Sequence, residues 1–279
     1  MKLNVLSIDW DYFIDATYDE RIMNFPDGGN EAISSGVSNY VWSMRYGDTR
    51  IQRDAGYIDR AIEDMYIRVD ELDIVKRALL NVKPSTRIVF ADSHADIYEF
   101  VTGRQDEACR QFNIFNIDHH SDCYNIGEEL NCGNWVNRLD DNNYISKYVW
   151  IKNEDSGEEK INTTLKNCKT RETSNISTID NVIWDYIFIC RSSVWSPPHL
   201  DKHFNELYHF IAIKLCKHCD PDFFVDRYTS MKKEIEDYVR IKEDMVKLLA
   251  EQIKEGDCTP ELNKIKKIFA DKEKENGRD

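Results

Sequence analysis

Three apolar segments of this sequence end in aspartates and histidines, the side chains that bind divalent metal ions. Their final residues read SIDWD at 7–11, ADSHAD at 91–96 and IDHHSD at 117–122. In open α/β sheets ligands bind outside the carboxyl ends of the strands, where three such motifs would meet. One acidic strand end is ordinary, whereas three of them predict a common site.

The spacing within the motifs indicates which side chains would face that site. Side chains alternate along extended chain, so Asp118, His120 and Asp122 are expected on one face and His119 on the other. The same alternation pairs Asp9 with Asp11. Adding the histidine of the second motif, the predicted metal ligands are Asp9, Asp11, His94, Asp118, His120 and Asp122.

Four carboxylates and two imidazoles form a donor set that suits Mn²⁺ or a similar divalent ion better than structural zinc. Without a cation, converging carboxylates repel one another and raise one another's pKa values. Two cations would remove that repulsion, and a water bridging them would be acidified into a hydroxide nucleophile. The motifs therefore predict two bound Mn²⁺ ions and a hydrolytic reaction.

The elements that must position these residues alternate between strands and helices. Strands are expected within 3–9, 86–96, 111–122, 144–151 and 181–193. A segment of helical length, 98–110, separates the second strand from the third, which is typical of the βαβ unit of a parallel sheet. We expect the polar stretch from the first strand to Tyr57, with PDGGNE at 26–31, to be a long loop with short elements. Residues 153–180 are expected to form an exposed excursion.

Apolar residues recur at helical spacing over 57–80 and 200–219, and over the Lys/Glu-rich residues 230–279. The chain is therefore predicted to have a three-layer α/β/α fold with a mostly parallel sheet over residues 1–220. Residues 221–279 are predicted to be a charged helical C-terminal extension that packs on this domain.

Composition limits the partners of such a protein. The chain has 279 residues and a net charge of −14, which argues against nucleic acid and anionic membranes and is compatible with a cationic substrate. There is neither an apolar run of 18 residues nor a signal peptide, so a cytoplasmic location is expected. The eight cysteines are expected to be reduced thiols, and Cys216 and Cys219 lack the second pair that a zinc ribbon needs. Oligomeric state is left open.

The motifs D-x-H-x-D at 118–122 and S-x-D-x-D at 7–11, with the strand-end His94, resemble the metal motifs of the arginase and ureohydrolase superfamily. Their order is permuted, since S-x-D-x-D comes last in typical arginases. The sequence is most similar to the peptide arginase branch, through IDWDYF, HHSD, NCGNW at 131–135 and DYIFICRSSVWSPPHL at 185–200. The resemblance covers roughly residues 3–203 and implies an arginase/deacetylase-like sheet.

The resemblance also implies a reaction and a role for each ligand. The reaction would be hydrolysis of a guanidinium group, with arginine, in a peptide or as a small guanidino substrate, giving ornithine and urea. Asp118 and Asp9 would bridge two Mn²⁺ ions. His94 and Asp122 would complete one ion's ligands, and His120 and Asp11 the other's. His119 or a residue of the NCGNW loop, such as Asn134, would donate a proton to the leaving amine.

Two interpretations of NCGNW remain open. In the first, Asn131 and Asn134 hydrogen-bond the substrate and Trp135 stacks on its planar cation. In the second, the segment is a tight turn before a helix beginning with WVNRLDD, and Trp135 belongs to the core.

Other functions also remain open at this point. IDHHSD resembles the signature of manganese-dependent phosphoesterases of the Asp-His-His type, in which Asp92 and His119 would bind metal directly. The histidine that usually precedes the first aspartates of that family is absent here, and no Gly-rich phosphate loop or basic cluster accompanies the motifs. A single-zinc deacetylase and a non-catalytic metal-containing binding protein are the remaining alternatives.

Overall fold

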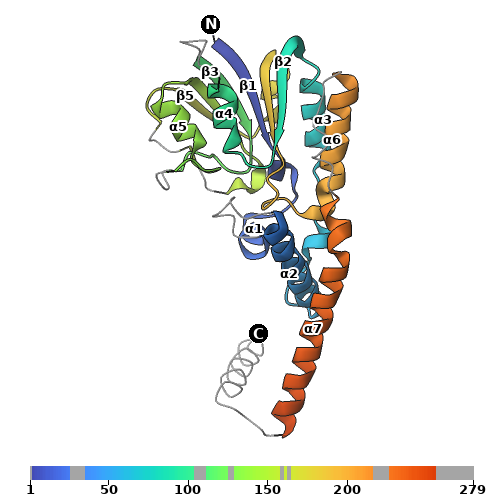
Figure 1. The fold of residues 1–279 in the computed structure, drawn as a ribbon. Helices are drawn as coiled ribbons and strands as arrows, with labels where there is room; N and C mark the ends of the chain where they lie inside the picture. The colour runs from blue at the N-terminus through green and yellow to red at the C-terminus, as the bar shows by residue number, and fades with distance from the viewer. Residues whose placement is uncertain are drawn as a thin grey trace.

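The computed structural model describes residues 2–25, 35–103, 111–124, 129–157, 160–161, 165–215 and 226–255. Within them, six strands form one parallel sheet in the order β2-β6-β1-β3-β4-β5 (Figure 1). The strands are β1 (Lys2–Asp9), β2 (Val82–Ala91), β3 (Gln111–Ile117), β4 (Ile145–Ile151), β5 (Lys169–Thr173) and β6 (Trp184–Cys190).

The sheet is covered by helices on both faces, which confirms the predicted three-layer α/β/α fold. Alternate residues of β1 enter two separate hydrophobic clusters, as the pleat of a strand requires. Leu6 and Ile8 join the cluster that contains α3 (Val69–Ala78) and α6 (Asp201–Lys214). Val5 joins the cluster on the other face, with α4 (Asp96–Thr102) and α5 (Trp135–Asp141).

The expected exposed excursion over 153–180 contains an edge strand, β5, that the sequence analysis did not predict. Its residues Lys169, Thr170 and Arg171 are exposed, so the segment lacks the apolar character that marks the central strands. Charged side chains are common on edge strands because they discourage pairing with another sheet.

A second difference concerns the polar stretch after β1, which contains α1 (Tyr18–Asn24) and the long helix α2 (Ser35–Asp54). The prediction of a long loop with short elements was wrong for α2. Trp42 and Tyr46 are fully buried, and Gly47 lies against the ring of Tyr238, where a Cβ atom would collide. Tyr238, which covers Gly47, comes from a distant part of the chain. PDGGNE lies outside the described residues.

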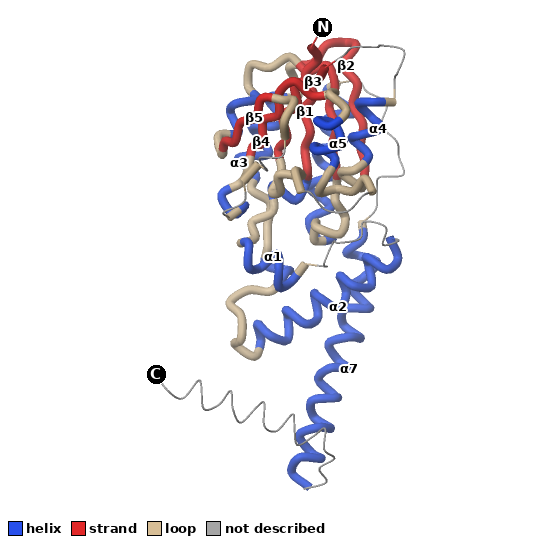
Figure 2. Tube along the Cα trace, turned by 90° about the vertical axis from the view of Figure 1, so that its left-hand side faces the viewer, coloured by secondary structure: helices blue, strands red, loops and turns tan. Residues whose placement is uncertain are grey.

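The C-terminal helix α7 (Arg227–Glu255) is present, and it packs along α2 below the carboxyl edge of the sheet (Figure 2). Met231 and Ile235, in its first turns, join the same hydrophobic cluster as α3 and α6. The first turns of α7 therefore pack on the sheet domain, and later turns contact α2. Cys216, Cys219 and residues 256–279 lie outside the described residues.

Short 3₁₀ helices connect these elements. They are η1 (Trp10–Phe13), η2 (Ile62–Asp64), η3 (Glu154–Ser156), η4 (Ile176–Ile179) and η5 (Pro198–Leu200). In the described part of the chain, no helix is both long enough and apolar enough to cross a bilayer.

Candidate metal centre

All six predicted metal ligands lie at the carboxyl edge of the sheet. Asp9 ends β1 and Asp11 follows in η1, while His94 lies in the turn between β2 and α4. Asp118, His120 and Asp122 follow β3, which is the direct neighbour of β1. The strand order therefore brings the motifs of residues 7–11 and 117–122 together, as predicted for a parallel sheet.

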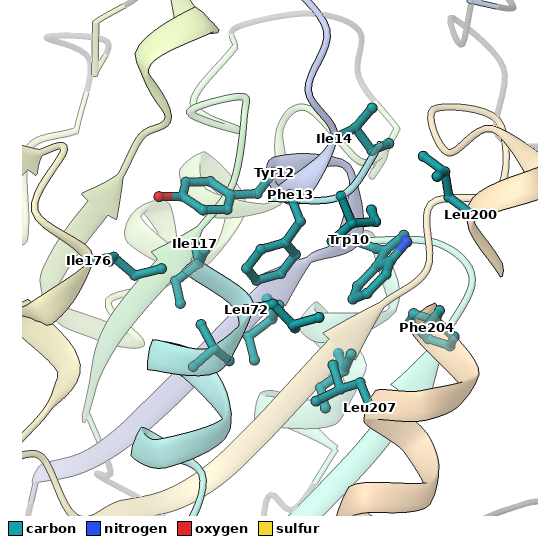
Figure 3. Packing of buried hydrophobic residues seen from close by; sticks show 14 of the residues in the cluster. Trp10, Tyr12, Phe13, Ile14, Leu72, Ile117, Ile176, Leu200, Phe204 and Leu207 are labelled. Atoms are coloured by element: carbon teal, nitrogen blue, oxygen red, sulfur yellow. The ribbon is translucent and has the colours of Figure 1, made fainter. Parts of the chain in front are cut away.

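The position of Asp11 depends on the core beneath it. Its neighbours Trp10 and Phe13 are fully buried and pack on each other with ring centroids 5.4 Å apart. Trp10 also meets the edge of Phe204 from α6, at 5.2 Å. Figure 3 shows these rings inserted between Leu72 and the α6 side chains. Because η1 is anchored on both sides, the carboxylate of Asp11 is held at the sheet edge.

Four ligands form a buried cluster, which we call the inner group: Asp9, His94, Asp118 and Asp122. The Nδ1 atom of His94 lies 3.1 Å from Asp9 Oδ2, 3.2 Å from Asp118 Oδ2 and 3.0 Å from Asp122 Oδ2. The hydroxyl of Ser7 is 2.7 Å from the other ring nitrogen, Nε2. Ser7 therefore fixes the ring with Nδ1 toward the carboxylates, as partners of metal-binding histidines commonly do.

Two neighbours orient the aspartates of the inner group. The Ser192 hydroxyl donates to Asp9 Oδ2 at 2.7 Å, and the indole N–H of Trp135 donates to Asp122 Oδ2 at 2.5 Å. Asp122 and Ser192 both adopt left-handed backbone angles, with φ of 52° and 49°. Such angles are uncommon outside glycine and cluster at functional sites.

Three ligands form a second cluster, the outer group: Asp11, Asp118 and His120. Their donor atoms lie within 4.8 Å of one another. His120 Nδ1 is 3.5 Å from Asp11 Oδ2 and 4.0 Å from Asp118 Oδ1. Asp118 thus presents Oδ2 to the inner group and Oδ1 to the outer group, the geometry of a bridging carboxylate. In the arrangement that the resemblance implied, Asp9 bridges as well; here its closest contacts are with the inner group.

Three carboxylates of the centre have raised pKa values in the absence of a cation. Burial and the charge of Asp9 raise the pKa of Asp11 to about 8, and burial raises that of Asp122 to about 6. Burial and the charges of Asp122 and Asp9 raise the pKa of Asp118 well above its usual value. Burial opposes protonation of His94, but the carboxylates around it raise its pKa well above the ordinary value. A divalent cation would neutralise the same carboxylates without a proton.

The residues present fit a divalent metal ion. Both carboxylate oxygens of Asp11 are buried, and within the described residues neither has a hydrogen-bond partner. Buried carboxylate oxygens that lack a hydrogen bond are costly, and coordination to a metal is one way to satisfy them. The oxygen-rich donor set with two imidazoles suits Mn²⁺ or a similar ion.

Strand alternation was the wrong reason for grouping Asp118, His120 and Asp122. Strand β3 ends at Ile117, so the three residues are not on extended chain and strand alternation does not apply to them. They come together because the chain turns. The backbone N–H of His120 donates to Asp118 Oδ1 at 2.8 Å, and the left-handed conformation of Asp122 directs its carboxylate toward His94.

His119 belongs to neither cluster and is buried. Burial, helped by the charge of Arg21, lowers the pKa of His119 well below its usual value, so the imidazole is neutral. A buried neutral ring is a poor proton donor, which argues against the catalytic role predicted for it. Asp92 is also outside both clusters, because it pairs with Arg191 Nε and the Ser193 hydroxyl, each at 2.9 Å.

The NCGNW segment follows the second of its two interpretations. Trp135 is fully buried at the start of α5 and holds Asp122, so it cannot stack on a substrate, and that prediction was wrong. The side chain of Asn134 is buried, accepting from the backbone N–H of Asn131 at 2.9 Å and donating to Glu129 O at 2.8 Å. Asn131 accepts from Gly133 N–H at 3.0 Å. The two asparagines therefore order the loop, and their substrate-binding and catalytic roles stay predictions.

Sequence reasoning missed three residues at the centre: Ser7, Arg21 and Ser192. Ser7 could have been found, because it lies two residues before Asp9 in S-x-D-x-D and shares its strand face. Arg21 is buried in α1, with Nη1 3.6 Å from Asp11 Oδ2, and nothing in its sequence context indicates this. Trp195 lies against His120, with ring centroids 5.2 Å apart.

Comparison of the chain with protein-family models, curated proteins and solved structures finds no match. The resemblance in the metal motifs is thus not supported by a wider similarity, and a function has to be argued from the geometry of the centre.

Proposed function

We propose that this protein is a metal-dependent hydrolase with a two-ion centre that cleaves guanidinium groups, as arginases do. The observation that carries the proposal is the position of Asp118, whose two oxygens face two different ligand groups. A single carboxylate between two clusters is an arrangement that suits two adjacent divalent ions.

The bound ions, which we expect to be two Mn²⁺, would acidify a water for attack on the guanidinium carbon, so that arginine yields ornithine and urea. The chain's own residues would orient this chemistry. Ser7, Ser192 and Trp135 hold the inner group, and the buried surroundings keep bulk water away. The resemblance of the motifs to peptide arginases favours arginine residues in a peptide over other substrates.

The substrate would approach from the side of His120. Its side chain is 26% exposed, whereas those of the other five ligands are buried. Trp195, beside it, is only partly buried and offers an aromatic face on which a planar cation can stack. The net charge of −14 favours a cationic substrate as well. A cytoplasmic location belongs to the same proposal.

The phosphoesterase alternative receives less support from the geometry. It needs Asp92 and His119 as metal ligands, and both lie outside the two clusters. Asp92 is instead engaged with Arg191 and Ser193. A single-zinc site would leave one of the two ligand groups without a role.

The proposal is tested by measuring metal content and urea release together. We expect about two Mn²⁺ per chain after manganese-supplemented expression, and urea from an arginine-containing peptide. Asp118→Asn should lose both properties, whereas Asp141→Asn, which changes an exposed aspartate of α5, should keep them. Free arginine, assayed in parallel, identifies the substrate form.

Three outcomes would contradict the proposal. Absence of metal would remove its premise. Metal without urea release, but with cleavage of a phosphodiester such as bis(p-nitrophenyl) phosphate, would favour the phosphoesterase. Metal with neither activity would favour the non-catalytic binding protein.

A further inference from the structure

The segment Arg191–Ser196, which follows β6 and which we call the β6 loop, contacts the inner group directly. Ser192 donates its hydroxyl hydrogen to Asp9 Oδ2 at 2.7 Å. The other oxygen, Oδ1, accepts from the backbone N–H of Asp11 at 3.2 Å. A carboxylate oxygen can accept more than one bond, so Ser192 leaves Oδ2 able to bind a metal while fixing its direction.

The β6 loop is held in turn by the two long helices. Trp42 of α2 donates its indole N–H to Ser193 O at 2.9 Å. Arg227, the first residue of α7, donates to Ser193 O at 2.8 Å and to Ser196 O at 2.9 Å. Trp42 is fully buried and Arg227 nearly so. Three backbone contacts thus connect α2 and α7 to a loop that touches a metal ligand.

Arg227 is itself fixed by a buried ion pair. Its Nε and Nη2 atoms donate to the two oxygens of Asp201, at 2.7 Å and 2.6 Å. A two-pronged pair of this kind sets the orientation of the guanidinium as well as its position. The direction in which Arg227 reaches the loop is therefore determined by Asp201, the first residue of α6.

We propose that Ser192 is a positioning residue for the metal ligand Asp9, and that α2 and α7 control its position through Trp42 and Arg227. The binding of one metal ion is then energetically coupled to the packing of the two helices. This inference rests on the metal centre of the proposed function, but not on guanidinium as the substrate.

The direct test replaces Ser192 by glycine. Glycine accepts the left-handed angle of φ 49°, so Ser192→Gly removes the hydroxyl without adding backbone strain. Partners of metal ligands contribute about 10- to 100-fold to affinity, so we expect a loss of that size for one of two Mn²⁺ ions. The ion bound by Asp11, Asp118 and His120 should be affected much less. Titration with Mn²⁺ monitored by electron paramagnetic resonance counts both ions.

Ser196→Ala is the matched control, because it also removes a buried hydroxyl of the same loop. That hydroxyl donates to Arg191 O at 2.8 Å and touches no metal ligand. The control should bind both ions with unchanged affinity. Equal losses in the two variants would overturn the role of Ser192, since any disturbance of the loop would then suffice.

The coupling to the helices is tested with Trp42→Phe, which keeps an aromatic ring in the core and removes the N–H that binds Ser193 O. We expect weaker binding of the same Mn²⁺ ion, by about tenfold or less. The decisive comparison is the double variant of Ser192→Gly and Trp42→Phe. If Trp42 acts through Ser192, its effect on affinity disappears in the Ser192→Gly background. Additive effects would overturn the coupling.

Arg227→Lys provides a second variant, which keeps the positive charge beside Asp201 but loses the paired hydrogen bonds to its two oxygens. The same selective loss of one ion is expected, and unchanged binding would contradict a role for α7. Wild-type protein that binds no Mn²⁺ would overturn both the proposed function and this inference. Two tight ions in both wild type and Ser192→Gly would overturn this inference alone.

Discussion

The two ligand groups share Asp118 but differ in how they are built. Each side chain of the inner group has a partner that orients it: Ser192 for Asp9, Ser7 for His94, Trp135 for Asp122 and Asn116 for Asp118. In the outer group, both oxygens of Asp11 lack a hydrogen bond to described residues, and His120 reaches solvent.

This difference indicates different tasks for the two positions. A preorganised, buried set of ligands binds its ion tightly and exchanges it slowly, because little reorganisation is needed. A less constrained set beside solvent binds more weakly and leaves room for substrate. We therefore expect the inner ion to be structural for the centre and the outer ion to be the exchangeable one.

The largest effect is expected from His94→Ala. Removing this ligand should weaken the inner ion by more than about 100-fold, beyond the effect of losing an orienting partner. Metal analysis after dialysis should then find about one ion or fewer per chain. Thermal melting of the metal-free protein checks that the cavity left by the ring has not unfolded it.

A smaller effect is expected from His120→Ala, which should release the outer ion and retain the inner one. Because this side chain is partly exposed, the metal-free melting temperature should hardly change. Urea release should nevertheless be lost. Equal metal losses in the His94 and His120 variants would remove the distinction between the two groups.

Trp135→Phe should have an intermediate to small effect, confined to the inner ion. The phenyl ring fills most of the space but cannot donate to Asp122, so affinity should fall by about tenfold. The buried carboxylate also loses a donor, which costs about 1–3 kcal/mol of metal-free stability. Calorimetric titration with Mn²⁺ separates the two effects, and unchanged affinity would show that Asp122 needs no orientation.

The smallest effect is expected from His119→Gln. His119 adjoins His120 in sequence, with ring centroids 4.8 Å apart, yet it belongs to neither group. Both ions should therefore remain, with affinities within about threefold of wild type, a change smaller than that from losing an orienting partner. Loss of one ion in this variant would instead indicate the phosphoesterase arrangement.

Most residues of the inner group could be predicted from the sequence. The strands that carry it are apolar runs that end in Asp or His, and such patterns indicate both a parallel sheet and its functional edge. His94, Asp9 and Asp118 follow directly from that argument. Asp122 was placed correctly for an incorrect reason, because its left-handed backbone has no signal in the sequence.

The missed features depend on contacts between distant residues. Trp135 was ambiguous because an aromatic after a glycine turn suits either a core or a binding surface. Ser192 and Trp42 act through partners far away in sequence, at Asp9 and Ser193. Helix α2 is polar on average and packs against α7, so its formation depends on tertiary packing.

The central place of β1 has a consequence for the order of folding. This first strand pairs with residues 111–117 on one side and with 184–190 on the other. To pair strands so far apart in sequence, the chain must first close a large loop. The entropy lost in closing it comes before the favourable contacts form, which slows folding. Asp9 is synthesised before Ser192, but the two side chains contact each other only after β6 has joined the sheet. Metal uptake is therefore expected to follow assembly of the whole sheet rather than guide it.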